Sequence, residues 1–387
     1  MWKSVASNTL TLFLLAMVAV GGVIGWGQRE YAGPGPLEQA ICLRVAPGDT
    51  ITRVSTRLEE EGAISDGRIF RIGADYSDKA SQLKFGSYII PAETSMAEIL
   101  EIVTKGGQSS CGTEVVYRVG VTASEVQLLE VDPASGDDVV LAEFDPTGEV
   151  PAEYAALRDA RDTRYRIVVA EGTTSWQVVE ALKSADFLTG SAGDVPEEGT
   201  LAPDSYELRA GSERAALLER MADRQTEILN NAWAERGEDL PFETREEALI
   251  LASIIEKETG LPDERETVAA VFVNRLRAGM RLQTDPTVIY GITEGKGVLG
   301  RGLRRSELRR ATPYNTYVID GLPPGPIANP GRASIEAALN PGESEFLFFV
   351  ADGTGGHAFA KTLDEHNINV RKWRQIEIDR QNQSSNQ

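Results

Sequence analysis

One residue pattern occurs twice in this sequence, and at each place it predicts a short strand, a turn and a helix. The matched residues are Val45, Gly48, Thr50, Val54 and Leu58 in the first copy and Val169, Gly172, Thr174, Val178 and Leu182 in the second. The Thr can cap the helix that follows the turn, and the apolar residues four and eight positions later form its buried face. A weaker third copy has Ile90, Ser95, Ile99 and Val103. The repeat therefore favours an α+β fold, with a compact β/α module over residues 38–105.

An uncharged stretch separates Lys3 from Arg29 and predicts a membrane-spanning helix at residues 9–27. Within it, residues 10–26 are nearly all apolar, and the run is long enough to cross the hydrocarbon layer of a bilayer. A cleaved signal peptide is the alternative, although the stretch exceeds the usual apolar core of such a peptide. Lys3 and the amino terminus favour a cytoplasmic location for residues 1–8. The remaining chain would then lie in the periplasm, on the outer side of the inner membrane, as a single-pass protein.

Composition limits the partners that the chain can bind. Its 387 residues carry a formal net charge of −20, whereas a nucleic-acid-binding protein needs a basic surface for the phosphates. We therefore expect no nucleic-acid partner.

The acidic segment 112–163 is broken by Pro and Gly and predicts either a small inserted β element or a partly flexible linker. Residues 376–387 are rich in Gln and Asn and predict a flexible tail.

The two cysteines, Cys42 and Cys111, flank the β/α module. In an oxidising compartment they can form a disulfide bond that closes this segment. Two unpaired buried thiols are the alternative, because the spacing does not show whether the two Cα atoms approach closely enough for a bond.

An acidic residue, Glu258, lies at the C-terminal end of an unusually apolar helix predicted for residues 245–259. At about 100° per residue, Glu258 shares a helix face with three apolar residues, whereas Glu256 points nearly the opposite way. The three residues are Leu251, Ile254 and Ile255. Burial on this face and the negative end of the helix dipole both disfavour the ionised carboxylate, so the pKa of Glu258 should be raised and the group could act as a general acid. A structural ion pair with Lys257 or Arg275 is the alternative.

The residues that follow this helix predict a sugar-binding cleft. Amides, hydroxyls, a carboxyl group and aromatic rings occur close together, and such groups hydrogen-bond to sugars or stack on them. The candidate substrate-binding residues are Gln283, Asp285, Tyr290, Tyr314, Asn315, Thr316 and Tyr317. Asp285 and Pro286 predict the start of a turn. The alternative is that some of these residues are helix caps and core tyrosines.

Other kinds of active site have little support in the sequence. The two histidines, His357 and His366, do not form a His-Glu-x-x-His motif, and two distant cysteines cannot make a structural zinc site. The sequence also has no Gly-rich phosphate loop followed by Lys. We therefore expect neither a metal nor a cofactor, and we expect His357 to order a loop or line the cleft.

Several long motifs resemble those of the endolytic murein transglycosylases, a family of membrane-anchored peptidoglycan-cleaving proteins that is also called YceG-like. The motifs lie at residues 253–259, 273–276, 280–291, 314–317, 321–327, 349–352 and 356–357. The resemblance extends more loosely to the anchor, to a LysM-like module at residues 38–105 and to residues 168–206. It implies an α+β catalytic domain at residues 164–375, in which Glu258 is the catalytic acid.

The resemblance also implies a reaction and its partners. In the family's reaction the acid protonates the oxygen between N-acetylmuramic acid (MurNAc) and N-acetylglucosamine (GlcNAc), and the muramic C6 hydroxyl closes a 1,6-anhydro ring without a cofactor. The enzyme would cut within glycan strands, limit the length of nascent strands and meet peptidoglycan synthases of the elongation machinery at the inner membrane. Two alternatives stay open: a hydrolytic muramidase with Asp285 as second carboxylate, and a non-catalytic peptidoglycan-binding scaffold.

Overall fold

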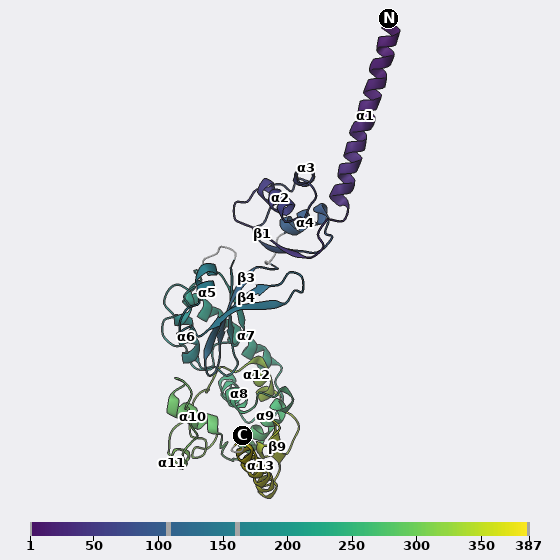
Figure 1. The fold of residues 1–387 in the computed structure, drawn as a ribbon. Helices are drawn as coiled ribbons and strands as arrows, with labels where there is room; N and C mark the ends of the chain where they lie inside the picture. The colour runs from purple at the N-terminus through teal and green to yellow at the C-terminus, as the bar shows by residue number, and fades with distance from the viewer. Residues whose placement is uncertain (1, 106–109, 159–162, 385–387) are drawn as a thin grey trace. The chain divides into compact units, whose positions relative to one another are not determined.

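The structure is a computed structural model that describes residues 2–105, 110–158 and 163–384 (Figure 1). Helices and strands are mixed along the chain, in agreement with the expected α+β class. Contacts divide the chain into two compact units. The first contains residues 1–115, 127–143 and 151–164, and the second contains residues 116–126, 144–150 and 165–387. All the candidate active-site residues belong to the second unit.

The first helix, α1, runs from Trp2 to Ala32 and is longer than the predicted membrane span (Figure 1). Within its residues Leu10–Ala32, an 18-residue window has a mean hydropathy of 2.1, and none of that window is buried inside the protein. At a rise of about 1.5 Å per residue, the stretch is long enough to cross a bilayer. Among the described residues it is the one helix that meets this length and composition.

The β/α module predicted for residues 38–105 contains a two-stranded antiparallel sheet and three helices. Its elements are β1 (Ile41–Val45), α2 (Ile51–Glu60), α3 (Gly67–Tyr76), β2 (Gly86–Ile90) and α4 (Met96–Lys105). Strand β1 pairs with β2 in a register that places Leu43 opposite Tyr88. Fully buried apolar side chains, among them Leu43, Leu58 and Phe70, fill the space between the strands and the helices. The module therefore has a hydrophobic core of its own.

A disulfide bond joins Cys42, on β1, to Cys111, and the two Cα atoms are 5.9 Å apart. The two residues are separated by 69 positions in the sequence, so the cross-link closes a loop that contains most of the module. Such a cross-link restricts the unfolded chain and thereby stabilises the folded module.

A five-stranded sheet has the strand order β5-β4-β3-β6-β7. Its strands are β3 (Thr113–Val119), β4 (Ser124–Val131), β5 (Asp138–Phe144), β6 (Arg164–Val169) and β7 (Ser205–Leu208); helix α5 (Ala152–Leu157) follows β5, and α6 (Ser175–Ser184) follows β6. The segment 112–163, predicted as an insertion or a linker, thus supplies three of the five strands. Of the two forms expected for this segment, the structure shows the β element. The sequence did not indicate that its strands join β6 and β7 in one sheet, because strand pairing joins residues that are distant along the chain.

Both copies of the sequence repeat form the predicted strand, turn and helix. In the first copy β1 leads through Gly48, whose φ is 85°, to Thr50, the N-cap of α2. In the second copy β6 leads through Gly172, whose φ is 77°, to Thr174, which caps α6. Glycine adopts a positive φ without the steric cost that a side chain brings, and this explains its place in both turns.

The rest of the second unit is mainly helical. Its elements are α7 (Arg214–Ala234), α8 (Arg245–Glu258), α9 (Pro262–Arg277), α10 (Asp285–Thr293), α11 (Arg305–Leu308), α12 (Arg332–Leu339), β8 (Phe348–Ala351), β9 (His357–Ala360) and α13 (Leu363–Ser384). Helix α8 packs against α7, α9 and α12, and its residues from Ala248 to Ile255 are all buried. Residues 376–384, predicted as part of a flexible tail, continue α13 as a helix.

Candidate active site

Helix α8 is fixed at both ends by its own sequence. At the N-terminus Thr244 and Glu247 form a capping box, in which each side chain accepts a hydrogen bond from the backbone of the other. At the C-terminus the backbone of Thr259 is extended, so the helix ends at Glu258. Because the residues between these ends are mostly buried, the core of the second unit holds Glu258 in a defined position.

The carboxyl group of Glu258 accepts a hydrogen bond from the hydroxyl of Thr284. Burial raises the pKa of Glu258 above its usual value, and the negative charge of Asp285 acts in the same direction. The hydrogen bond from Thr284 and the side chains of His357 and Arg275 lower this pKa, but burial is the largest contribution. The direction predicted from the helix face is therefore confirmed, and its main cause is removal of the carboxyl group from water.

In the described part of the chain, Glu258 does not form the ion pair with Lys257 or Arg275 that was its structural alternative. The ammonium of Lys257 donates a hydrogen bond to the carbonyl oxygen of Gly172, at 3.1 Å. The guanidinium of Arg275 donates to the carbonyl oxygen of Leu347, at 2.6 Å. Since both basic side chains are hydrogen-bonded to backbone oxygens, the carboxyl group of Glu258 stays available for proton transfer.

Glu256 turns away from Glu258, as the helix geometry predicts. Its carboxylate accepts a hydrogen bond from the backbone N–H of Gly331, at 3.0 Å. One turn earlier, the hydroxyl of Ser253 accepts a hydrogen bond from the backbone N–H of Ile327, at 3.0 Å. Glu256 and Ser253 thus hold the loop before α12, which is a structural role.

Asp285 and Tyr317 form a pair beside Glu258. The phenol of Tyr317 donates a hydrogen bond to Asp285 Oδ1, at 2.7 Å. The predicted turn at Asp285 and Pro286 is wrong, because these residues begin helix α10. Proline suits the first turn of a helix, where its missing N–H would have no partner. Asp285 is exposed, so its second carboxylate oxygen remains accessible to a sugar hydroxyl.

Two of the predicted substrate-binding residues, Asn315 and Thr316, are fully buried and shape the loop instead. The amide of Asn315 donates hydrogen bonds to the carbonyl oxygens of Glu307, at 3.0 Å, and Arg310, at 2.7 Å. The hydroxyl of Thr316 accepts a hydrogen bond from the backbone N–H of Thr284, at 3.0 Å. Thr316 therefore holds Thr284, the residue that contacts Glu258, and is not itself a substrate-binding residue.

Gln283 has an exposed side chain and an unusual backbone conformation. Its φ of 52° lies in the left-handed region, which residues with a side chain rarely adopt. Its backbone N–H donates to the carbonyl oxygen of Thr316, at 3.1 Å, and this bond helps to hold the strained turn. The contact of its amide with substrate stays a prediction.

Tyr290 and Tyr314 form an aromatic pair with ring centroids 4.9 Å apart. The phenol of Tyr290 donates a hydrogen bond to Glu198 Oε2, at 3.2 Å. The backbone N–H of Ser175 donates to the same carboxyl group, at 2.8 Å, and burial raises the pKa of Glu198. The sequence analysis missed Glu198, because it lies 92 positions from Tyr290 in a turn-rich segment without a recognisable motif. Both rings are partly exposed, so they pack against each other and still present a surface that a sugar can contact.

His357 begins β9 and pairs with Glu264 on α9. Its Nδ1 is 2.8 Å from Glu264 Oε2, and its backbone N–H donates to Glu264 Oε1, at 2.9 Å. The imidazole also packs edge-on against Phe349, with ring centroids 5.2 Å apart. His357 therefore orders the β8–β9 hairpin, as expected, and contributes to the electrostatic environment of Glu258. The sequence analysis missed Glu264, which lies 93 positions away.

The described residues contain no group of three or more His, Cys, Asp and Glu side chains that is placed to hold a metal ion. What the arrangement offers is a buried carboxyl group with a raised pKa, next to exposed polar groups on α10 and the preceding turn. Such a group can protonate an oxygen atom of a bound sugar chain.

Comparisons with known proteins give several relatives. A protein of Streptococcus pneumoniae serotype 2 named endolytic murein transglycosylase is 27% identical over 374 residues, which cover 93% of this chain and 63% of the relative. A Bacillus subtilis protein of the same name is 27% identical over 368 residues, which cover 92% of this chain and 91% of the relative. The chain thus spans less than two thirds of the length of the Streptococcus protein.

Among solved structures, a YceG-like protein from Listeria monocytogenes is 25% identical, with a TM-score of 0.44. The alignment covers 85% of this chain and 98% of that one. The sequence model of the YceG-like family matches residues 43–134 and 143–372, which include most of the β/α module, most of the five-stranded sheet and the candidate site. The chain therefore belongs to the YceG-like family.

Proposed function

We propose that this chain is an endolytic lytic transglycosylase that cleaves the bond between MurNAc and GlcNAc within peptidoglycan strands and leaves 1,6-anhydro-MurNAc ends. The observation that carries the proposal is the environment of Glu258, a buried carboxyl group with a raised pKa that accepts a hydrogen bond from Thr284. The relatives named endolytic murein transglycosylase support the general activity, cleavage within murein strands.

A single carboxyl group can carry out this reaction in two steps. Protonated Glu258 donates its proton to the glycosidic oxygen, the bond to the muramic C1 breaks, and GlcNAc leaves with that proton. The positive charge that develops on the muramic ring is relieved when the C6 hydroxyl attacks C1. The carboxylate of Glu258 takes the proton of that hydroxyl, so the acid is regenerated and no water is consumed. Ring closure is favoured because the attacking hydroxyl belongs to the same sugar.

One observation favours a hydrolytic muramidase as the second candidate. Asp285 lies near enough to Glu258 to raise its pKa, and a hydrolase needs a second carboxylate to activate water or to attack the sugar. However, one oxygen of Asp285 is already bonded to the phenol of Tyr317. In the proposed reaction Asp285 and Tyr317 instead hold a sugar hydroxyl, together with Gln283 and the exposed edges of Tyr290 and Tyr314.

The test is cleavage of uncrosslinked glycan strands by the purified full chain in ¹⁸O water, followed by mass analysis of the ends. We expect 1,6-anhydro ends that are lighter by one water than reducing ends and carry no heavy oxygen. Heavy oxygen at the muramic C1 would show hydrolysis and make Asp285 the next residue to replace. Binding of the strands without any cleavage would indicate a non-catalytic scaffold.

The remaining parts fit an enzyme that acts at the membrane. Helix α1 would anchor the chain in the inner membrane as a single span, with the rest in the periplasm. The module at residues 38–105 would serve as a LysM-like glycan-binding unit or as a spacer between the membrane and the catalytic domain at residues 164–375. At this location the enzyme would cut nascent strands, limit their length and meet peptidoglycan synthases.

A further inference from the structure

Glu258, the candidate acid on α8, lies next to the N-terminal end of helix α10. A cavity with no role in the proposed function lies along one face of α10. The face consists of Pro286, Ile289, Tyr290 and Thr293, which recur at the three- and four-residue spacing of one helix side. The cavity has a volume of about 350 Å³, which lies at the lower end of the range for small-ligand sites. It is large enough for one or two amino-acid residues or a single sugar.

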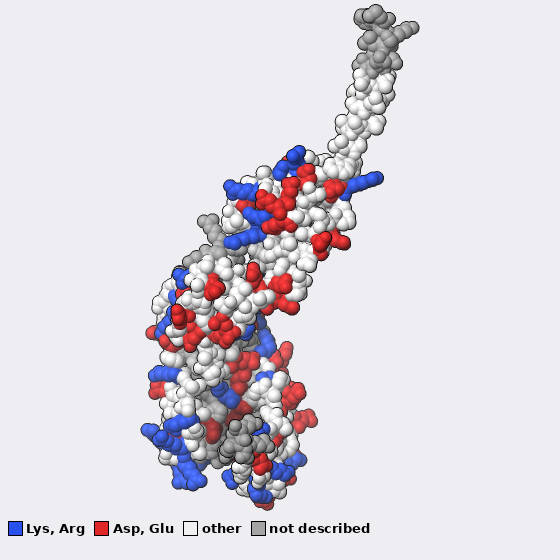
Figure 2. All heavy atoms as spheres, in the orientation of Figure 1, with Lys and Arg blue, Asp and Glu red and all other residues white. Residues whose placement is uncertain are grey.

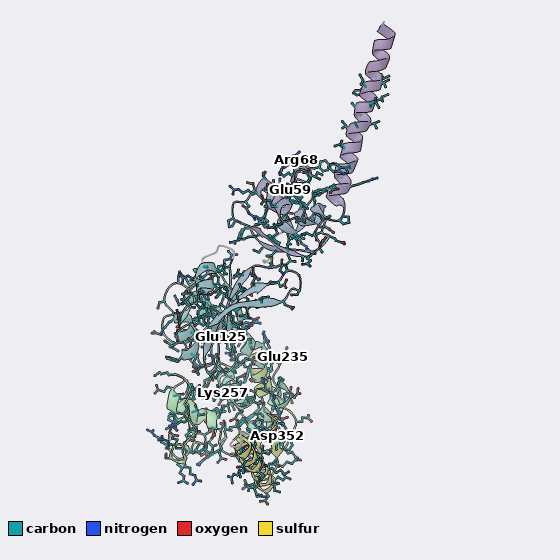
Figure 3. All side chains as sticks on the ribbon, viewed as in Figure 1. Glu59, Arg68, Glu125, Glu235, Lys257 and Asp352 are labelled. Atoms are coloured by element: carbon teal, nitrogen blue, oxygen red, sulfur yellow. A yellow bond between two sulfur atoms is a disulfide. The ribbon has the colours of Figure 1, made fainter. Side chains whose placement is uncertain are left out.

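Two cations line this cavity, Lys257 from α8 and Arg301 from the loop before α11. Two lining residues are sequence neighbours of the candidate site: Lys257, labelled in Figure 3, directly precedes Glu258, and Pro286 directly follows Asp285. An ammonium has three N–H donors, and among the described residues only the bond to Gly172 uses one of them. Burial lowers the pKa of Lys257, and the nearby carboxyl groups of Glu256 and Glu198 act in the opposite direction; an anion in the cavity would stabilise the charged form further.

Arg301 is the first residue of an arginine segment, which we define as residues 301–310. The segment contains five arginines, all of them exposed: Arg301, Arg304, Arg305, Arg309 and Arg310. Figure 2 shows basic side chains gathered over the region of α11. Of these five arginines, all within the described residues, Arg301 is the one that forms an ion pair, with Glu307 at 2.6 Å. In a chain of net charge −20, such a local excess of positive charge indicates an anionic ligand.

The chemistry of the proposed substrate identifies that anion. The sugar hydroxyls and acetamido groups of the glycan strand carry no charge, and the lactyl carboxyl of each muramic residue is uncharged while it is bonded to its peptide, so the glycan part of an intact strand offers no anion to Lys257 and Arg301. The muramic residues of peptidoglycan carry stem peptides, whose free carboxylates are the charged groups nearest to the bond that is cut. Arginine and lysine pair well with carboxylates, and the apolar part of the cavity lining, such as Ile289 and Val298, suits alanine methyl groups.

We propose that the cavity between Lys257 and Arg301 is a subsite for the stem peptide, and that the arginine segment binds the peptide's carboxylates. The inference rests on the proposed cleavage of glycan strands and adds a requirement to it: the enzyme selects strands that still carry their peptides.

The experiment compares cleavage of two substrates by the purified full chain in detergent. One is an uncrosslinked strand with its stem peptides, and the other is the same strand after an amidase has removed them and the lactyl carboxyls that this exposes have been converted to uncharged amides. A charge-assisted hydrogen bond typically changes binding by about ten- to a hundredfold, so kcat/KM should be at least about tenfold higher for the peptide-bearing strand. In Arg301→Gln this ratio should fall toward one.

Two further variants test why the kcat/KM ratio of the two strands falls in Arg301→Gln. Glu307→Gln also breaks the ion pair of Arg301 but keeps the guanidinium, so the substrate preference should be retained or increased. Val298→Trp fills the exposed edge of the cavity without changing any charge, and it should reduce the preference as Arg301→Gln does. The thermal unfolding of each variant is compared with that of the parent chain, and the ratio is read from the folded variants.

The outcomes separate this inference from the proposed function. Cleavage of both strands at equal kcat/KM by the parent chain would overturn the peptide subsite but leave the transglycosylase intact. A preference that survives both Arg301→Gln and Val298→Trp would place peptide recognition elsewhere and would also overturn the inference. If the ratio is one and polyphosphate binds the parent chain more tightly than Arg301→Gln, the arginine segment binds a phosphate polymer instead. Cleavage of neither strand would contradict the proposed function itself.

Discussion

Replacement of Glu258 by Gln should separate catalysis from folding. The amide keeps the shape of the side chain and can still accept the hydrogen bond from Thr284, but it cannot donate a proton to the glycosidic oxygen. General acid catalysis contributes about 10²- to 10⁴-fold to a rate, so kcat should fall by at least about two to four powers of ten. This loss corresponds to about 3 to 5 kcal/mol of transition-state stabilisation.

The same substitution should not destabilise the fold at neutral pH. Burial raises the pKa of Glu258 in the folded chain, so between the usual carboxyl pKa and the raised value the folded chain binds more protons than the unfolded chain. Stability due to this group is therefore highest at low pH and falls as the pH rises through that window. Because the amide in Glu258→Gln has no charge to bury, the melting temperature of this variant at neutral pH should equal or exceed that of the parent chain. At about pH 4 this difference should disappear.

The matched control is Glu256→Gln, two positions earlier on the same helix. The carboxylate of Glu256 holds the backbone N–H of Gly331, and an amide oxygen would make a weaker, uncharged bond. We expect this variant to lose about 1 kcal/mol of unfolding free energy and to retain most of its cleavage rate.

Both variants are compared by release of soluble fragments from uncrosslinked strands. Their thermal unfolding is followed by circular dichroism from about pH 4 to 8, a range that begins near the usual carboxyl pKa and extends above it. The expected result is opposite behaviour: Glu258→Gln is stable and inactive, whereas Glu256→Gln is active and slightly less stable. An equal loss of activity in the two folded variants would refute the assignment of the acid to Glu258.

Three other predictions follow from contacts in the structure. Thr284→Val removes a hydrogen bond that lowers the pKa of the candidate acid, so the alkaline limb of the kcat/KM profile should move to higher pH; an unchanged profile would contradict this. Replacement of Cys42 and Cys111 by Ser should destabilise the first module by about 4 kcal/mol, measured by urea unfolding, because the cross-link closes a loop with a separation of 69 residues. A fragment that begins at Gly112 should fold and cut soluble strands, whereas one that begins at Arg164 should aggregate, because β6 loses β3 as its neighbour; equal solubility and activity would argue against this role of β3.

Local sequence signals were sufficient for the elements that short-range physics controls. Thr50 and Thr174 cap their helices by bonds to residues three positions away, and Gly48 and Gly172 provide the positive φ of the turns. The apolar face of α8, which led to Glu258, is likewise a property of consecutive residues. The α+β class and the apolar N-terminal helix rest on signals of the same kind.

Contacts between distant parts of the chain were decided only by the tertiary structure. The partners Thr284 of Glu258, Glu198 of Tyr290 and Glu264 of His357 lie 26, 92 and 93 positions away, respectively. The burial of Asn315 and the role of residues 112–163 in the five-stranded sheet depend on the same long-range packing. The sequence by itself determined which carboxyl group lies at the end of a buried helix, because helix geometry is local. Only the fold determined what surrounds that group, because its neighbours are brought together by packing rather than by proximity along the chain.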